Sequence, residues 1–344
     1  MKMDRLPDPE QRMSVYAPML GAIWRILESY GIEPRDVIPE KHYRPGRKFL
    51  YADRVSFREY DTIQARAASL VKDPAMGIRM GLLIHPSHLG ALGYAWMASS
   101  TLRTALNRGR RFGRMFNEHV DITLEDRPGG IRATYGMSRQ PTRPNLVGDG
   151  QIAGLLSLCR SSFGSQLTPA RVTLKRQKPA DPGPWLEYFG ENVSFGQENN
   201  SLMISSADAD SPLTTSNPEM IRLHEDVIER YLMRMDRDSV LNRARLHIME
   251  QLPSGRVTED DTARALAVSK RTLHRKLREN GETFRSVLAQ VRMNLARRYI
   301  EIEDYSVTEI AFLLGYTDTS AFSRAFRSWF GHSPTQARSQ LDAA

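Results

Sequence analysis

Basic side chains near the carboxyl end of the chain suggest a definite chemistry. Five cations fall within nine residues and no acidic residue lies between them: Lys270, Arg271, Arg275, Lys276 and Arg278. An arginine can donate two parallel hydrogen bonds to O6 and N7 of guanine, and either cation type can pair with a phosphate. His274 lies in the same run and can bond a base edge or a phosphate. The run therefore predicts a surface that binds double-stranded DNA.

The basic run belongs to a pattern that occurs twice. Residues 260–278 predict a short amphipathic helix, a tight turn at Ala267 and Val268, and a second helix. Residues 307–327 repeat this arrangement, with Gly315 at the turn. Both copies predict a helix-turn-helix unit, in which the second helix enters the major groove.

The second helices of the two copies share their apolar and basic positions at an offset of 49 residues. Leu273 aligns with Phe322, Leu277 with Phe326, and Arg275 with Arg324. We expect the four apolar side chains to lie in the core. The opposite face of the later helix is less basic and carries these candidates for DNA contact: Thr319, Ser320, Ser323, Arg324 and Arg327.

A third helix is predicted between the two copies. Apolar residues recur along one helical face from Phe284 to Tyr299. A helix over residues 284–300 would be about 25 Å long. A rigid spacer of this length would set the second helices roughly one DNA turn, about 34 Å, apart. One copy of the chain could then enter two successive major grooves.

Basic residues on an exposed helix often form only a solvated face. The tandem pattern favours DNA reading here. The alternative is an architectural or non-specific DNA-binding protein whose N-terminal domain only oligomerises, with an affinity dominated by phosphate contacts. Net charge does not decide between them. The chain carries +8, and residues 240–344 hold 16 Lys and Arg against 12 Asp and Glu, so only the clustering singles out this region.

Residues 240–341 resemble the AraC/XylS family of bacterial transcription regulators. Residues 310–334 follow the second-motif signature of that family almost position by position, although Tyr316 stands where Phe is commoner. A further departure is that Asn280-Gly281 in the first copy corresponds to Phe330-Gly331, one residue farther along, in the second. The resemblance implies that Ile310, Ala311 and Leu314 pack the first helix, and that Ser333-Pro334 opens a closing helix.

The resemblance also implies roles for the polar side chains. Arg271, His274 and Arg275 fall on base-facing positions, Thr319, Ser320, Ser323 and Arg324 fall on the equivalent face, and Arg327 falls where phosphate contact is expected. A small-molecule effector, RNA polymerase as a partner, and activation rather than repression are also implied.

Length and composition predict two globular domains, since the 344 residues are 40% apolar. A single cysteine, Cys159, excludes an internal disulfide, and its apolar neighbours predict an inert core residue. No charged leader and no run of about 18 apolar residues is present. We therefore expect a cytoplasmic protein without a membrane partner.

The first 210 residues predict an α+β domain that binds an effector or dimerises. Helices are expected from Ser14 to Tyr30, from Ser56 to Val71 and after Ser100, where Gly109 would permit close packing. Alternating apolar residues predict a hairpin over residues 120–135, a strand over residues 171–175, and a second hairpin over residues 193–204.

The N-terminal region resembles the arabinose-binding-type domain of a branch of AraC/XylS regulators over residues 15–210. Residues 73–81, 88–102 and 188–196 carry the resemblance. It implies effector binding or dimerisation, and it does not imply arabinose. Tyr94, Trp96, Met97 and Trp185 could line a pocket, although such side chains usually form the core, so no ligand residue is assigned.

No catalytic residues, metal site or cofactor is predicted. His85 and His88 have the spacing of a metal pair, but Pro86 disfavours presentation on a helix and no carboxylate or cysteine set accompanies them. No phosphate loop or nucleophile elbow is present, and Gly90 and Gly93 fit close helix packing better.

The expected boundaries are an α+β domain over residues 1–210, a linker helix over residues 211–239, and an all-α DNA-binding domain over residues 240–344 that contains two helix-turn-helix motifs and their connecting helix. The segment from Ser205 to Pro218 is expected to be a hinge. A helix from Asn217 to Met235 has apolar positions that could also serve a homodimer. The sequence thus predicts a sequence-specific DNA-binding regulator controlled by a small molecule.

Overall fold

The computed structural model describes residues 13–43, 54–235, 239–255, 257–300 and 305–342. The chain divides into two compact units, residues 1–228 and 229–344, and each is described by itself. The division falls within helix α10 (Pro218–Met235), which agrees with the helix expected from Asn217 to Met235. Residues 236–238 of the expected linker lie outside the described part of the chain.

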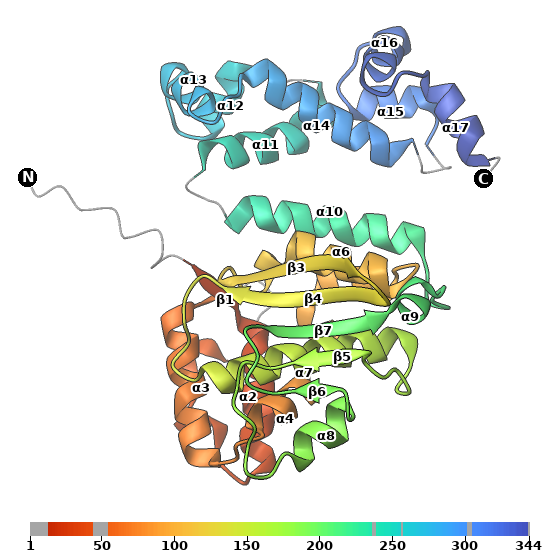
Figure 1. Ribbon diagram of the computed structural model, residues 1–344. Coiled ribbons are helices and arrows are strands. Elements are labelled where there is room, and N and C mark those ends of the chain that lie inside the picture. Colours follow the sequence, from red (N-terminus) through yellow and green to blue (C-terminus); the bar gives the residue numbers. More distant parts are fainter. Residues whose placement is uncertain (1–12, 44–53, 236–238, 256, 301–304, 343–344) are drawn as a thin grey trace, which may run out of the picture. The chain divides into compact units, whose positions relative to one another are not determined.

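The N-terminal unit combines helices with two sheets. Its larger sheet has the strand order β3-β4-β7-β5-β6 (Figure 1). The strands are β3 (Val120–Arg127), β4 (Gly130–Met137), β5 (Arg171–Thr173), β6 (Val193–Ser194) and β7 (Asn200–Ser205). Neighbouring strands are antiparallel except for β5 and β6. The hairpin predicted over residues 120–135 is confirmed as β3 and β4, and the predicted strand at Arg171 is confirmed as β5.

The second predicted hairpin is wrong. β6 and β7 are not neighbours, because β5 lies between them and pairs in parallel with β6 and antiparallel with β7. β7 also pairs with β4, where Ala133 lies opposite Leu202. Asn199 and Asn200 therefore lead into β7 without forming a two-residue hairpin turn. The pairing is decided by contacts distant in sequence.

The helices of the N-terminal unit lie mostly before the strands. They are α2 (Leu20–Ser29), α3 (Phe57–Val71), α4 (Met76–Leu82), α5 (Ala91–Met97), α6 (Leu102–Phe112), α7 (Pro144–Phe163), α8 (Gly183–Phe189) and α9 (Ser206–Asp210). Ser56 caps α3 by accepting from the Glu59 amide, and Thr101 caps α6 in the same way from Thr104. Helices α6 and α7 pack against the larger sheet.

The first helix begins later than predicted. Ser14 does not cap it but belongs to β1 (Ser14–Tyr16), which pairs with β2 (Arg54–Ser56) in the smaller sheet. The amide and hydroxyl of Ser14 donate to Glu118 Oε2 at 2.9 and 2.7 Å. These partners lie far along the chain and hold Ser14 extended, and α2 starts only at Leu20.

Helices α4 and α7 approach closely at small residues. Gly77 and Gly81 on α4 face Gly150 and Gly154 on α7, with four-residue spacing in both helices. A Cβ on Gly81 would lie 2.4 Å from the Ala153 Cβ. The close packing predicted for two other glycines is also confirmed: a Cβ on Gly93 would lie 1.6 Å from the carbonyl oxygen of Pro86, and one on Gly109 would lie 3.1 Å from Trp96 Cζ3.

The segment expected to be a hinge is fixed to the N-terminal unit. It contains α9, whose Ala209 is buried. Farther along, the Leu213 and Asn217 amides donate to the carbonyls of Ser100 and Ala98 at 2.9 Å each. The Thr215 hydroxyl donates to the Met97 carbonyl at 2.6 Å. The polar composition of this segment thus reflects side chains that face solvent and not a free backbone.

The C-terminal unit is helical. After α10 it contains α11 (Val240–Gln251), α12 (Glu259–Ala265), α13 (Lys270–Arg278), α14 (Phe284–Tyr299), α15 (Val307–Leu313), α16 (Thr319–Phe330) and α17 (Pro334–Asp342). The predicted connecting helix is confirmed as α14. Leu273, Leu277 and Phe322 are fully buried and Phe326 is 2% exposed, so all four belong to the core as predicted.

Two further features of composition have structural counterparts. Cys159 is fully buried in α7, and burial raises the pKa of its thiol to about 12, which confirms an inert core residue. Across the described residues, the structure contains no helix that combines the length and apolarity needed to span a membrane.

Candidate DNA interface and ligand cavity

The duplicated pattern folds into two helix pairs, α12 with α13 and α15 with α16. In both, the residue that follows the first helix and its C-cap has a positive φ: +55° at Ala267 and +67° at Gly315. These positions are 48 residues apart, whereas the N-caps of the second helices, Ser269 and Asp318, are 49 apart. The later turn therefore contains one extra residue, and the offset of 49 holds only for the second helices.

Each turn is fixed by an arginine that sequence reasoning missed. Arg243 on α11 donates to the carbonyl of Leu266 at 2.7 Å. Arg292 on α14 donates to the carbonyls of Leu314 and Gly315, both at 2.9 Å. These oxygens end the first helix of each pair and would otherwise lack partners. Arg243 and Arg292 are themselves 49 residues apart, so comparison at that offset could have identified them.

The predicted DNA contacts lie on the surface of α13 and α16. Leu273 and Leu277 turn into the core, and the remaining face of α13 carries the cations. The exposed side chains are Lys270, Arg271, Arg275, Arg278, Ser320, Arg324 and Arg327, and those of intermediate exposure are His274, Thr319 and Ser323. The structure thus brings the predicted residues of each helix together on an accessible face.

Acidic residues neutralise part of the basic face of α13. Lys270 Nζ lies 3.2 Å from Asp260 Oδ2, and His274 Nε2 lies 2.8 Å from Glu259 Oε2. Both carboxylates come from the first turn of α12. The absence of acids within the run itself therefore does not leave every cation free, because the preceding helix supplies them.

Glu279, one residue beyond α13, pairs with two more cations. It forms an ion pair with Arg275, and its Oε2 lies 2.9 Å from Lys276 Nζ. The hydrogen bond from Lys276, together with the charges of Lys276 and Arg275, lowers the pKa of Glu279. Its carboxylate is thus ionised at neutral pH and competes with any polyanion for these side chains.

The second copy has no such competition. At the offset of 49 residues, Ser328 stands where Glu279 stands in the first copy. Within the described residues no ion pair involves Arg324 or Arg327, and the same is true of Arg271 and Arg278. These four exposed guanidinium groups are available to phosphates or to guanine edges without breaking an internal contact.

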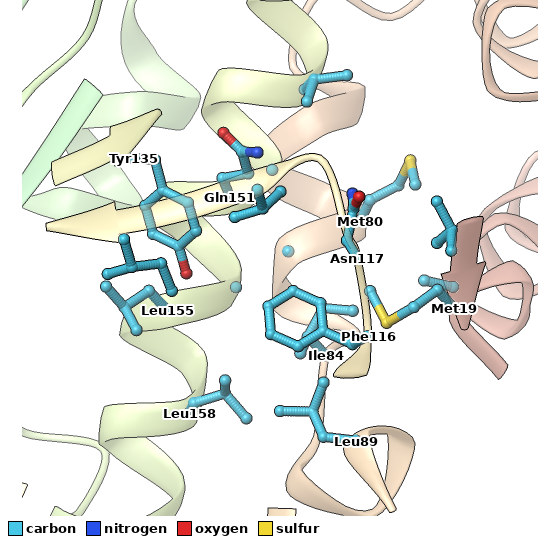
Figure 2. A pocket seen from close by; sticks show the side chains of 18 of the residues that line it. Met19, Met80, Ile84, Leu89, Phe116, Asn117, Tyr135, Gln151, Leu155 and Leu158 are labelled. Atoms are coloured by element: carbon cyan, nitrogen blue, oxygen red, sulfur yellow. The ribbon is translucent and has the colours of Figure 1, made fainter. Parts of the chain in front are cut away.

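The N-terminal unit contains an apolar cavity of about 140 Å³ (Figure 2). Helices α2 to α7, both strands of the β3-β4 hairpin and β1 contribute to its lining. Of the four pocket candidates suggested by the sequence, Trp96 lines it, whereas Tyr94, Met97 and Trp185 do not. Sequence reasoning missed the other lining residues because they come from segments as far apart as Val15 and Leu158.

His85 and His88 have a local structural role. The His85 side chain accepts from the Ser87 amide at 3.2 Å, and His88 Nδ1 accepts from the His85 amide at 3.0 Å. Together they cap the short 3₁₀ segment Pro86–Leu89. Among the described residues, no group of three His, Cys, Asp or Glu side chains could hold a metal ion.

Known proteins share both units. Residues 50–213 match the arabinose-binding domain of AraC transcription regulators, and residues 262–340 match a helix-turn-helix domain. The ornithine utilization regulator of Pseudomonas aeruginosa is 28% identical over 320 residues, which cover 92% of this chain and 94% of that protein. Transcriptional activator NphR of a Rhodococcus species is 34% identical over 143 residues, or 39% of this chain and 43% of that protein.

A solved structure shares the fold. The crystal structure of transcriptional regulator CdpR from Pseudomonas aeruginosa gives a TM-score of 0.50 at 20% sequence identity, over 94% of this chain and 98% of that one. The relatives along the whole chain are regulators, and the matched domains follow the same order as the two units described above. The chain is a member of the AraC family of transcription regulators, with an arabinose-binding-type N-terminal domain and a C-terminal helix-turn-helix domain.

Proposed function

We propose that this regulator reads a specific DNA sequence through α13 and α16, which enter two successive major grooves. The observation that carries the proposal is the equivalent placement of two solvated faces, each beside a buried pair of apolar residues at the same spacing. The connecting helix α14 has 16 residues and hence a length of about 24 Å. This suits two helices that bind one side of the duplex.

The proposed division of labour follows the chemistry of the side chains. Arg271, His274, Arg275 and Arg324 would contact bases, as would the shorter Thr319, Ser320 and Ser323. Lys270, Arg278 and Arg327 would contact phosphates and set the orientation. The proposed domain limits are residues 1–210 for the sensor, 211–239 for the connection and 240–344 for DNA binding.

We further propose that a small molecule bound in the N-terminal unit controls DNA binding, and that the protein activates transcription through RNA polymerase. The cavity supports the first part, and the name of the relative NphR, a transcriptional activator, supports the second. An effector shifts the equilibrium only as far as its affinity differs between the two states of the protein. Because it acts on DNA and its relatives are named as regulators, we propose a cytoplasmic protein without enzymatic activity, and a homodimer as its assembly.

Selection of bound fragments from sheared genomic DNA, at physiological salt, tests the proposed reading of sequence. We expect a few enriched sites that share a motif in two blocks about one helical turn apart, roughly 10 base pairs from centre to centre. Even recovery across the genome, together with a steep loss of binding as salt is raised, would instead support the architectural alternative.

Glu279→Gln is expected to strengthen DNA binding about threefold at low salt, because Arg275 and Lys276 lose an internal competitor for phosphate. Fluorescence anisotropy with a labelled selected site measures the change, which should diminish as salt is added. Glu187→Gln, an exposed change of equal charge in the N-terminal unit, is the control. An equal gain in both variants would show that only net charge matters and would contradict a role for the Glu279 pairs.

A further inference from the structure

We infer that the cavity of the N-terminal unit binds a neutral, mainly apolar small molecule that carries one hydrogen-bond-accepting oxygen, such as a compact ester or ketone. This inference rests on the proposed effector control and specifies its ligand. It excludes both the sugar after which the domain family is described and a charged amino acid.

Most of the cavity wall is hydrocarbon. Its lining includes Met80, Ile84, Leu89, Phe116, Leu155 and Leu158, all labelled in Figure 2. A sugar would bury several hydroxyl groups against these side chains, and each hydroxyl left without a partner would cost free energy. A ligand with an apolar body instead gains free energy from every part of its surface that leaves water.

The wall also lacks a cation that could hold an anionic group. Among the described residues that line the cavity, none is lysine, arginine or histidine. The carboxylate of Asp61 is the one acidic group there, and it is already engaged, since it accepts from the Thr142 amide at 3.0 Å and hydroxyl at 2.6 Å. The carboxylate of an amino acid would therefore be buried without a counter-ion, which is costly.

Four polar side chains on the wall remain open to a ligand. Within the described residues, Tyr60, Gln64, Tyr135 and Gln151 have no hydrogen-bond partner for their side chains. Burial raises the pKa of both phenols, so Tyr60 and Tyr135 keep their protons and can donate. Figure 2 shows the ring of Tyr135 extending from its strand toward the other lining residues, beside Leu155. The Tyr135 hydroxyl is thus the donor best placed for a ligand oxygen.

The volume limits the size of the ligand. A cavity of about 140 Å³ is similar to an engineered apolar cavity of about 150 Å³ that binds benzene. One ring with a short polar group therefore matches the space. Methyl benzoate and acetophenone have this size, an accepting carbonyl oxygen and no charge.

Calorimetric titration of the full-length protein tests the inference with defined probes. We expect saturable binding of methyl benzoate or acetophenone, at least tenfold weaker binding of benzoate, and no detectable binding of L-arabinose or L-ornithine. Tighter binding of any of the last three would overturn the inference. So would the absence of saturable binding by both neutral probes.

Two variants locate the bound probe. Tyr135→Phe keeps the ring and should weaken methyl benzoate binding about fivefold through loss of one hydrogen bond. Leu155→Trp should fill the space and abolish binding, with circular dichroism to verify folding. Tyr94→Phe, whose hydroxyl lies outside the cavity, is the matched control and should bind as the parent does. Unchanged affinity in Tyr135→Phe and in folded Leu155→Trp would overturn the inference. These titrations contain no DNA, so their failure is separate from a failure of the genomic selection.

Discussion

Gly81→Ala is expected to lower the free energy of unfolding of the N-terminal unit by about 3 kcal/mol. The new Cβ would lie 2.4 Å from the Ala153 Cβ and 2.7 Å from the backbone nitrogen of Gly154. Because part of the obstacle is backbone, α4 and α7 would have to separate, which opens the packing along both helices. Thermal unfolding followed by circular dichroism should show the transition of this unit about 6–12 °C lower.

Gly154→Ala is the matched control for Gly81→Ala. It adds the same methyl group to the facing helix, where the nearest atom, Ile84 Cγ1, is 3.4 Å away in ordinary contact. Replacement of a helical glycine by alanine should then raise stability by about 0.5–1 kcal/mol. A loss of similar size in both variants would contradict the asymmetric packing of α4 against α7.

The same helix contact explains why the cavity exists and why the sequence did not predict it. Gly81 and Gly154 both line the cavity, so the close approach of the two helices determines one of its walls. The approach pairs residues more than 70 positions apart, and no local periodicity records that pairing. The aromatic residues noticed in the sequence, Tyr94 and Trp185, were suggested by their type alone and lie elsewhere.

Local signals predicted the fold where local chemistry decides it. The hairpin of β3 and β4 was found because its strands adjoin a glycine-rich turn, and α3 because Ser56 precedes a periodic helix. The hairpin expected around Asn199 failed because β5, some 30 residues earlier, takes the place between β6 and β7. Ser14 failed similarly, since its partner Glu118 lies 104 residues away.

The DNA-binding face shows the same distinction at the level of single side chains. The spacing of Leu273 and Leu277 was enough to orient α13, because a helix repeats its faces at three and four residues. The charge state of that face was not predictable from the run, because Glu259 and Asp260 reach it from the preceding helix. The accessible cations are therefore fewer than the sequence suggests.

This difference in pairing leads to unequal consequences for two equivalent arginines. On a selected DNA site, Arg324→Ala is expected to cost about 2–3 kcal/mol of binding free energy, near the upper end for a bidentate base contact. Arg275→Ala is expected to cost about 1 kcal/mol, because Arg275 must first leave Glu279 to reach DNA. Each change should relax preference at one base position, measured by anisotropy with sites altered one base pair at a time.

The control for both arginine variants is Arg285→Ala, which removes an exposed cation from α14, outside the two second helices. It should weaken binding little and equally on all sites. Equal losses for Arg275→Ala and Arg324→Ala would show that Glu279 does not limit Arg275. If the losses were also the same on every DNA sequence, both residues would be phosphate contacts, and the specificity of the two helices would have to come from Arg271, His274 and the hydroxyl groups of α16. The pair of variants therefore separates the geometric equivalence of the two helices from their electrostatic inequality.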